Sequence, residues 1–136
     1  MVFVNCAPIY WFSKKQVGIE TSTFGSEFIA IKQCCEYLRG LRFELQLMGI
    51  PIEGPCFVYG DNKSVLTNSS QTFSVLKKKL NSIAYHFVRE GSAKDEWRIA
   101  YINRDDNCAD MLTKPLVGMK RRKFTNMLLM WVYEGD

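Results

Sequence analysis

The chain has 136 residues and a net charge of +4, and 47% of its residues are hydrophobic and 13% aromatic. This length suits a single domain over 1–136 and leaves no room for a second full domain. The aromatic content excludes a disordered chain. No run approaches the roughly 20 apolar residues of a membrane span, and the first residues do not read as a signal peptide. We therefore expect an intracellular protein, cytoplasmic or nuclear, with no membrane partner.

The cysteines point to free thiols. Their number is odd, no two have the C-x-x-C spacing, and they fit neither a zinc site nor a disulfide framework. They are Cys6, Cys34, Cys35, Cys56 and Cys108. Unpaired thiols are typical of a reducing compartment.

The first half of the chain predicts a hairpin and a long helix. Two β-rich runs, Val2–Val4 and Ile9–Phe12, lie close together and are typical of a β-hairpin. Apolar residues then recur at every third or fourth position, which is the pattern of one apolar helix face. Thr23 suits an N-cap, and a glycine and a proline follow Met48, so we expect a helix over about Thr23–Met48.

The rest of the chain alternates strands and helices. We expect a strand at Cys56–Tyr59, a helix at Asn62–Asn68, a helix at about Leu76–Gly91, a strand at Trp97–Ile102, a helix that ends at Leu112 after an N-cap in Asp105–Asn107, and a helix at about Met119–Val132. Strands interleaved with helices are typical of an α/β domain with a mixed sheet.

Three carboxylates stand where catalytic acids often lie in α/β proteins. Glu27 is in the first turns of the long helix, Asp61 directly follows a strand, and Asp110 is in the helix after the last strand. Carboxylates that converge from distant positions bind hard cations such as Mg²⁺. Each also has a purely structural interpretation, as a helix-dipole partner, an N-cap or a first-turn charge. Their spacing alone does not decide between these interpretations.

Four segments, in this order, resemble the RNase H domain of Pol polyproteins from copia-type retrotransposons. They are Trp11–Gln16 with Glu20–Ala30, Val58–Ser64, Asn81–Glu90 and Ala109–Leu116. The resemblance extends over about Val2–Leu129. It implies an RNase H-like mixed sheet flanked by helices, and a metal-dependent endonuclease that hydrolyses the RNA strand of RNA–DNA hybrids. The implied partners are an RNA–DNA hybrid and the reverse transcriptase and integrase domains of the same polyprotein.

The resemblance assigns roles to the three carboxylates. The family uses four carboxylates with Mg²⁺ or Mn²⁺, two ions in a complete site. Glu27 matches its first-helix glutamate, Asp61 its strand-end aspartate and Asp110 its last aspartate. Glu27 and Asp61 would then help to hold the ion that activates water, and Asp110 the second ion. We expect the three carboxylates to converge in the folded chain.

The fourth carboxylate of the family lies on a strand that precedes the opening hairpin. This chain begins at the segment that matches the second strand, so we expect a fold that lacks the first, central strand and its aspartate. We also expect the hairpin to close the gap by pairing directly with Cys56–Tyr59, because unpaired buried backbone groups are costly. Nuclease activity is expected to be weak or absent, and the resemblance leaves open whether this chain is an enzyme.

Several basic residues are candidates for contacts with nucleic-acid phosphates, although such runs can also be solvated helix faces. They are Lys14, Lys15, Lys77, Lys78, Lys79 and Arg89. Two function hypotheses follow: an RNase H-like domain of a polyprotein, impaired in this chain, or a catalytically inactive transposon-derived remnant that at most binds nucleic acid. An α/β binding domain without a nucleic-acid role is a third interpretation.

Overall fold

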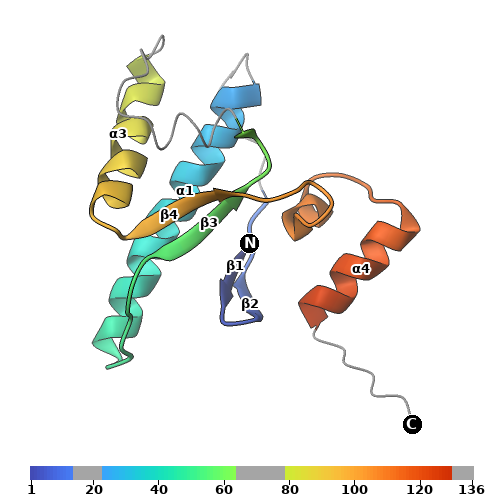
Figure 1. Cartoon of the computed structure of the whole chain (residues 1–136), viewed down its shortest axis with the longest axis horizontal. Helices are drawn as coiled ribbons and strands as arrows, with labels where there is room; N and C mark the ends of the chain where they lie inside the picture. Colours follow the sequence, from blue (N-terminus) through green and yellow to red (C-terminus); the bar gives the residue numbers. More distant parts are fainter. Residues whose placement is uncertain (14–22, 64–78, 130–136) are drawn as a thin grey trace. The chain divides into compact units, whose positions relative to one another are not determined.

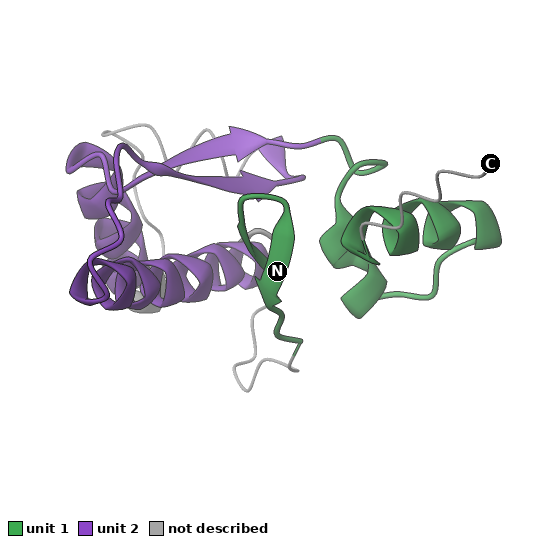
Figure 2. Cartoon of the chain, turned by 90° about the horizontal axis from the view of Figure 1, so that it is seen from below, with its two compact units in different colours: residues 1–15, 103–136 green, residues 16–102 purple. Residues whose placement is uncertain are grey.

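The computed structural model describes residues 1–13, 23–63 and 79–129 (Figure 1). These residues form both helices and strands, as expected for an α/β protein. The chain groups into two compact units. Unit 1 contains residues 1–15 and 103–136, and unit 2 contains residues 16–102 (Figure 2). Each unit is described by itself, and the expectation of a single domain stays a prediction.

Unit 2 is a parallel strand pair with two helices. It contains α1 (Thr23–Leu47), β3 (Cys56–Gly60), α3 (Lys79–Ala93) and β4 (Trp97–Tyr101). β3 and β4 pair in parallel, in continuous register from their first residues to their last. Parallel strands need a long crossover connection, and α3 lies within it.

The core of unit 2 lies between the helices and the strand pair. Side chains alternate along β3, so that Val58 is buried while its neighbours Phe57 and Tyr59 are exposed. Helices α1 and α3 contact each other, and the rings of Phe28 and Tyr85 stack with their centroids 4.8 Å apart. The first half of the apolar face predicted for the long helix, from Phe28 to Leu38, is therefore buried in this core, whereas Met48 at its end is exposed.

Helix α1 ends where the sequence predicted, through a specific capping motif. Gly49 has a φ of +76°, a conformation that glycine adopts without strain. Its N–H donates to Gln46 O at 2.9 Å, and Ile50 N–H donates to Leu45 O at 3.0 Å. This pair of bonds is the Schellman motif, which satisfies carbonyl groups that the last helical turn leaves without partners.

Unit 1 contains β1 (Val2–Val4), β2 (Ala7–Tyr10), the 3₁₀ helix η1 (Cys108–Leu112) and α4 (Gly118–Leu129). The two strands are antiparallel and form the predicted hairpin, although β2 begins two residues before the expected strand. Ser13 Oγ donates to Leu112 O at 2.9 Å and so joins the segment after the hairpin to η1. In α4, Phe124 is fully buried.

Two expectations about secondary structure need correction. The helix expected to end at Leu112 is a short 3₁₀ helix, because Asn107 caps it just before Cys108 and Pro115 follows closely. The strands that the structure describes form two separate two-stranded sheets, β1–β2 and β3–β4, and not one mixed sheet. The hairpin belongs to unit 1 and β3 to unit 2, so the expected direct pairing of the hairpin with β3 stays a prediction.

Several expected elements lie outside the described residues. The helix expected at Asn62–Asn68, the start of the helix expected at Leu76–Gly91 and the end of the last helix fall mostly on residues 64–78 and 130–136, which are not described. The RNase H-like arrangement stays a prediction. In the described part of the chain, no helix has the length and apolar character needed to cross a bilayer.

Candidate functional site

Two of the predicted carboxylates lie in unit 2. Asp61 directly follows β3, and its side chain is half-buried. Pairing continues to the very end of β3, where Gly60 O accepts a hydrogen bond from Ile102 N–H at 3.0 Å. Asp61 therefore stands at the carboxyl end of a parallel strand, where α/β proteins commonly place ligand-binding groups.

Glu27 comes from the helix that packs on this strand. It lies in the first turns of α1 and is half-buried. Helix α1 contacts β3, and Figure 1 shows the start of α1 and the end of β3 at the same end of unit 2. The fold of unit 2 thus brings the elements that carry Glu27 and Asp61 to one end, as the site prediction requires.

A positive charge accompanies Asp61 at this strand end. The Lys63 ammonium lies 5.0 Å from the ring centroid of Tyr101, and Tyr101 is the last residue of β4. An ammonium over an aromatic face is attracted by the ring quadrupole. This contact places the ammonium of Lys63 over the end of β4, beside β3.

The third carboxylate, Asp110, belongs to η1 in unit 1, and its backbone is fixed by local hydrogen bonds. Asn107 Oδ1 accepts from Ala109 N–H at 3.2 Å, and Asp110 O accepts from the N–H groups of Thr113 and Lys114, each at 3.2 Å. The capping side chain and the two bonds that follow it define this short helix. They also fix the position from which the Asp110 carboxylate projects.

The Asp110 carboxylate is a buried negative charge held by two ammonium groups. Its residue is only 6% exposed. Lys114 Nζ lies 3.0 Å from its Oδ2 and Lys120 Nζ lies 3.8 Å from the same atom. Oδ2 has no hydrogen-bond partner of acceptable geometry, so both contacts are ion pairs. Buried charges need such compensation because burial removes their hydration.

The donor atoms suit a hard divalent cation, but a complete cluster is not seen. Carboxylate oxygens are the ligands that Mg²⁺ prefers, but Asp110 Oδ2 is already paired with the Lys114 and Lys120 ammonium groups. Over residues 1–13, 23–63 and 79–129, no group of three His, Cys, Asp or Glu side chains could hold a metal ion. Asp110 lies in unit 1 and the other two carboxylates lie in unit 2. Their convergence stays a prediction.

The predicted phosphate contacts are mostly outside the described residues. Lys14, Lys15, Lys77 and Lys78 are among them, and Lys79 begins α3 but its side chain is not described. Arg89 is described, and its guanidinium lies 4.4 Å from the centroid of the Tyr85 ring. These residues remain predictions for nucleic-acid binding.

Two lysines beside Asp110 were not predicted. Lys114 is four residues after Asp110, a spacing that brings side chains together on a helical turn, so the sequence held a signal for it. Lys120 comes from α4, beyond Pro115, and no local pattern links it to Asp110.

The five cysteines are free thiols, as predicted. Burial raises the pKa of the Cys34, Cys35 and Cys108 thiols above the ordinary value. The Arg42 guanidinium donates to Cys56 Sγ at 3.2 Å. A raised thiol pKa lowers the thiolate fraction, so these three cysteines are poor nucleophiles near neutral pH.

Comparisons with known proteins find relatives among plant retrotransposon polyproteins. The chain is 27% identical over 128 residues to the Retrovirus-related Pol polyprotein from transposon RE2 and 28% identical over 116 residues to that from transposon RE1, both of Arabidopsis thaliana. These matches cover 94% and 85% of this chain, but 9% and 8% of the relatives. The Retrovirus-related Pol polyprotein from transposon TNT 1-94 of Nicotiana tabacum is 30% identical over 106 residues, which are 78% of this chain and 8% of that protein. No family model and no solved structure matches the chain.

Proposed function

We propose that this chain, which is homologous to one segment of the Pol polyproteins of copia-type retrotransposons, is an RNase H-like domain that acts on RNA–DNA hybrids. The observation that carries the proposal is the position of Asp61 at the carboxyl end of parallel strand β3, at the end of unit 2 where α1 begins with Glu27. The chain spans 8–9% of the length of these relatives. Its proposed partners therefore include other parts of such a polyprotein, the reverse transcriptase and integrase domains.

Glu27, Asp61 and Asp110 would hold Mg²⁺ or Mn²⁺, two ions in a complete site. Bound divalent ions supply an activated water and stabilise the negative charge of a phosphodiester during hydrolysis. In this chain, η1 holds Asp110 in a buried position, and Lys114 and Lys120 balance its charge. Both ammonium groups stand beside the carboxylate, so they would also reduce its repulsion of a substrate phosphate.

A cleavage assay tests the proposal. The purified chain is incubated with an end-labelled RNA–DNA hybrid and with a DNA duplex of the same sequence, in Mg²⁺ or Mn²⁺. We expect cleavage confined to the RNA strand of the hybrid and lost in Asp61→Asn, because Asp61 would be one of the ligands of the metal ions. Equal cleavage of the DNA duplex, or cleavage that survives Asp61→Asn, would contradict the proposal.

The second candidate function is an inactive, transposon-derived domain that binds nucleic acid. The ion pairs of Asp110 with Lys114 and Lys120 favour it, because they engage a carboxylate that a metal ion would need. The same assay separates the two functions. Binding of the hybrid without cleavage in either metal supports the inactive domain, and RNA-strand cleavage that needs Asp61 supports the enzyme.

A further inference from the structure

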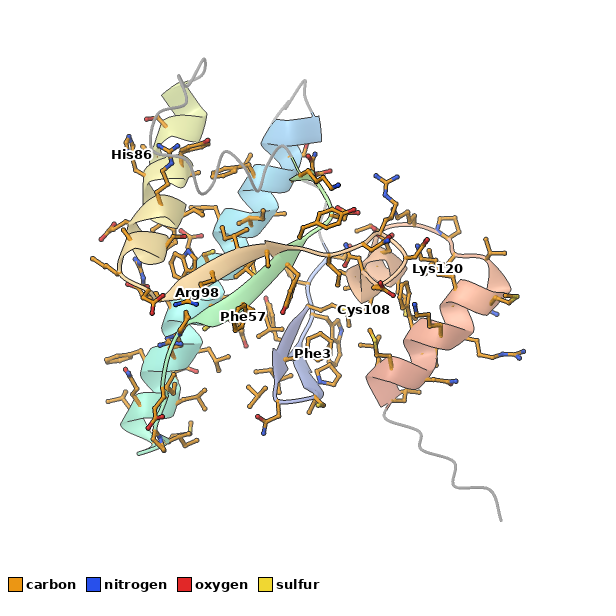
Figure 3. The ribbon with its side chains drawn as sticks, viewed as in Figure 1. Phe3, Phe57, His86, Arg98, Cys108 and Lys120 are labelled. Atoms are coloured by element: carbon orange, nitrogen blue, oxygen red, sulfur yellow. The ribbon has the colours of Figure 1, made fainter. Side chains whose placement is uncertain are left out.

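Helix α4 carries the run Lys120–Lys123 and has no acidic residue between Gly118 and Leu129. Lys120 Nζ donates to Arg104 O at 2.8 Å and to Asp105 Oδ1 at 3.1 Å (Figure 3). One helical turn later, Lys123 Nζ donates to Asp105 O at 3.0 Å and to Asp106 Oδ1 at 2.6 Å. The two lysines therefore hold the turn that precedes η1, and two aspartates of that turn balance their charges.

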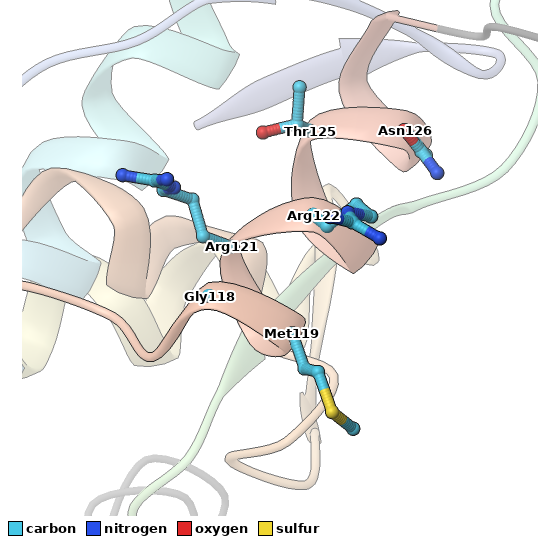
Figure 4. Close-up of a pocket in the computed structure, with 6 residues that line it drawn as sticks. All are labelled: Gly118, Met119, Arg121, Arg122, Thr125 and Asn126. Atoms are coloured by element: carbon cyan, nitrogen blue, oxygen red, sulfur yellow. The ribbon is translucent and has the colours of Figure 1, made fainter.

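The two arginines between these lysines face elsewhere. Arg121 and Arg122 are exposed, and in the described part of the chain neither takes part in an ion pair. They line a shallow surface groove with Gly118, Met119, Thr125 and Asn126 (Figure 4). The same view shows both guanidinium groups extending away from the helix. The run of four basic residues thus divides into two lysines that bind the preceding turn and two exposed arginines that do not.

We propose that Arg121 and Arg122 bind the phosphate backbone of a nucleic acid. This inference rests on the proposed function. A guanidinium presents a planar fork of donors that matches phosphate oxygens, and its charge here is not balanced by a described acidic neighbour. The Thr125 hydroxyl and the Asn126 amide lie one turn further along the same groove and can donate to phosphate or sugar oxygens. Such contacts position a nucleic acid without reading its sequence.

Salt-dependent binding of the full chain tests this surface. Fluorescence anisotropy measures binding of a labelled RNA–DNA hybrid and of a DNA duplex of the same sequence, with KCl varied from about 50 to about 200 mM. We expect the double variant Arg121→Gln/Arg122→Gln to bind the hybrid about tenfold more weakly at the lowest salt. The slope of log affinity against log salt should become shallower by about 2, one for each lost phosphate contact.

A matched control removes the same charge elsewhere. Lys32→Gln/Lys94→Gln removes two positive charges from surface ion pairs, one within α1 and one at the end of α3. We expect the affinity of this double variant for the hybrid to stay within about twofold of the wild-type affinity. Equal weakening in both double variants would show a general charge effect and would overturn the proposal. Arginine-dependent binding to phosphatidylserine vesicles, without arginine dependence on either nucleic acid, would also overturn it.

The two probes separate this inference from the proposed function. Arginine-dependent binding of the DNA duplex without binding of the hybrid would contradict the proposed function and support the inference. Hybrid binding that is unchanged in Arg121→Gln/Arg122→Gln would contradict the inference and leave the proposed function supported. If the chain binds neither the hybrid nor the DNA duplex, the inference is overturned. Lys120→Gln/Lys123→Gln should lower the thermal midpoint by about 2 °C or more, whereas the arginine variant should leave it unchanged.

Discussion

The indole ring of Trp97 lies directly against Gly91, so closely that a Cβ atom on Gly91 would be 2.0 Å from Trp97 Cζ2. Trp97 is fully buried, and its Nε1 donates to Val88 O at 2.9 Å. The absent side chain of Gly91 lets the end of α3 approach the first residue of β4. This contact anchors the start of the strand that pairs with β3.

Gly91→Ala should therefore destabilise the protein. Real Cβ atoms do not approach another carbon this closely, so the ring or the helix must shift, and overpacking of this kind costs about 1–3 kcal/mol. Urea unfolding followed by tryptophan fluorescence and circular dichroism measures the free energy of unfolding. Gly40→Ala in α1 is the matched control, because no neighbouring atom lies within 4 Å of its Cβ position. It should be neutral or stabilising by up to about 1 kcal/mol. Equal effects of the two substitutions would contradict the packing described at Gly91.

Arg39 should contribute through its flat guanidinium and not only through its charge. Its Cζ lies 4.4 Å from the Phe87 ring centroid and 5.1 Å from that of Trp97, and its Nε donates to Glu96 Oε2 at 2.7 Å. Arg39→Lys keeps the charge but loses the stacking and the fork, so we expect a loss of about 1 kcal/mol in unfolding experiments.

Lys32→Gln serves as the comparison for Arg39, because Lys32 forms an ordinary i,i+4 pair with Glu36 on the same helix. Loss of this ion pair in Lys32→Gln should lower the free energy of unfolding by no more than about 0.5 kcal/mol. A smaller effect from Arg39→Lys than from Lys32→Gln would show that the ring contacts add nothing to stability.

Alkylation should distinguish the cysteines by burial. Cys6 is exposed, whereas Cys35 and Cys108 are buried and their thiol pKa values are raised. A raised pKa leaves a smaller thiolate fraction at pH 8, so iodoacetamide should modify Cys6 first and should reach the buried thiols slowly. The reaction of the buried thiols should accelerate as the pH rises, because the thiolate is the reacting form. Mass spectrometry of peptides after timed quenching measures this order. Modification of Cys35 at the rate of Cys6 in the folded chain would contradict the burial.

The local elements could be predicted from the sequence, but their partners could not. Helix α1 has a long apolar stripe and a glycine at its C-terminal cap, so its limits followed from local signals. The strand Cys56–Gly60 and the opening hairpin also followed from residue type. Which strand pairs with which depends on contacts distant in sequence, and the expected single sheet was accordingly wrong for the described strands.

The candidate site shows the same limit. The position of Asp61 after a strand was evident from the residues Val58–Asp61, and the structure confirms that β3 ends there. The division of Lys120–Lys123 into two faces follows from helical spacing, since Lys120 and Lys123 are one turn apart. The contact of Lys120 with Asp110 depends on how α4 folds back toward η1, which no local pattern determines.

The proposed metal site requires that Glu27, Asp61 and Asp110 bind the same metal ions. Electron paramagnetic resonance measures Mn²⁺ binding to the wild-type chain and to Glu27→Gln, Asp61→Asn and Asp110→Asn, with Glu53→Gln as an exposed carboxylate control. We expect each of the three variants to weaken Mn²⁺ binding by about tenfold or more, because each removes a ligand from shared ions, while the control leaves the affinity unchanged. Wild-type affinity in Asp110→Asn, or in all three variants, would contradict a single metal site built from these carboxylates.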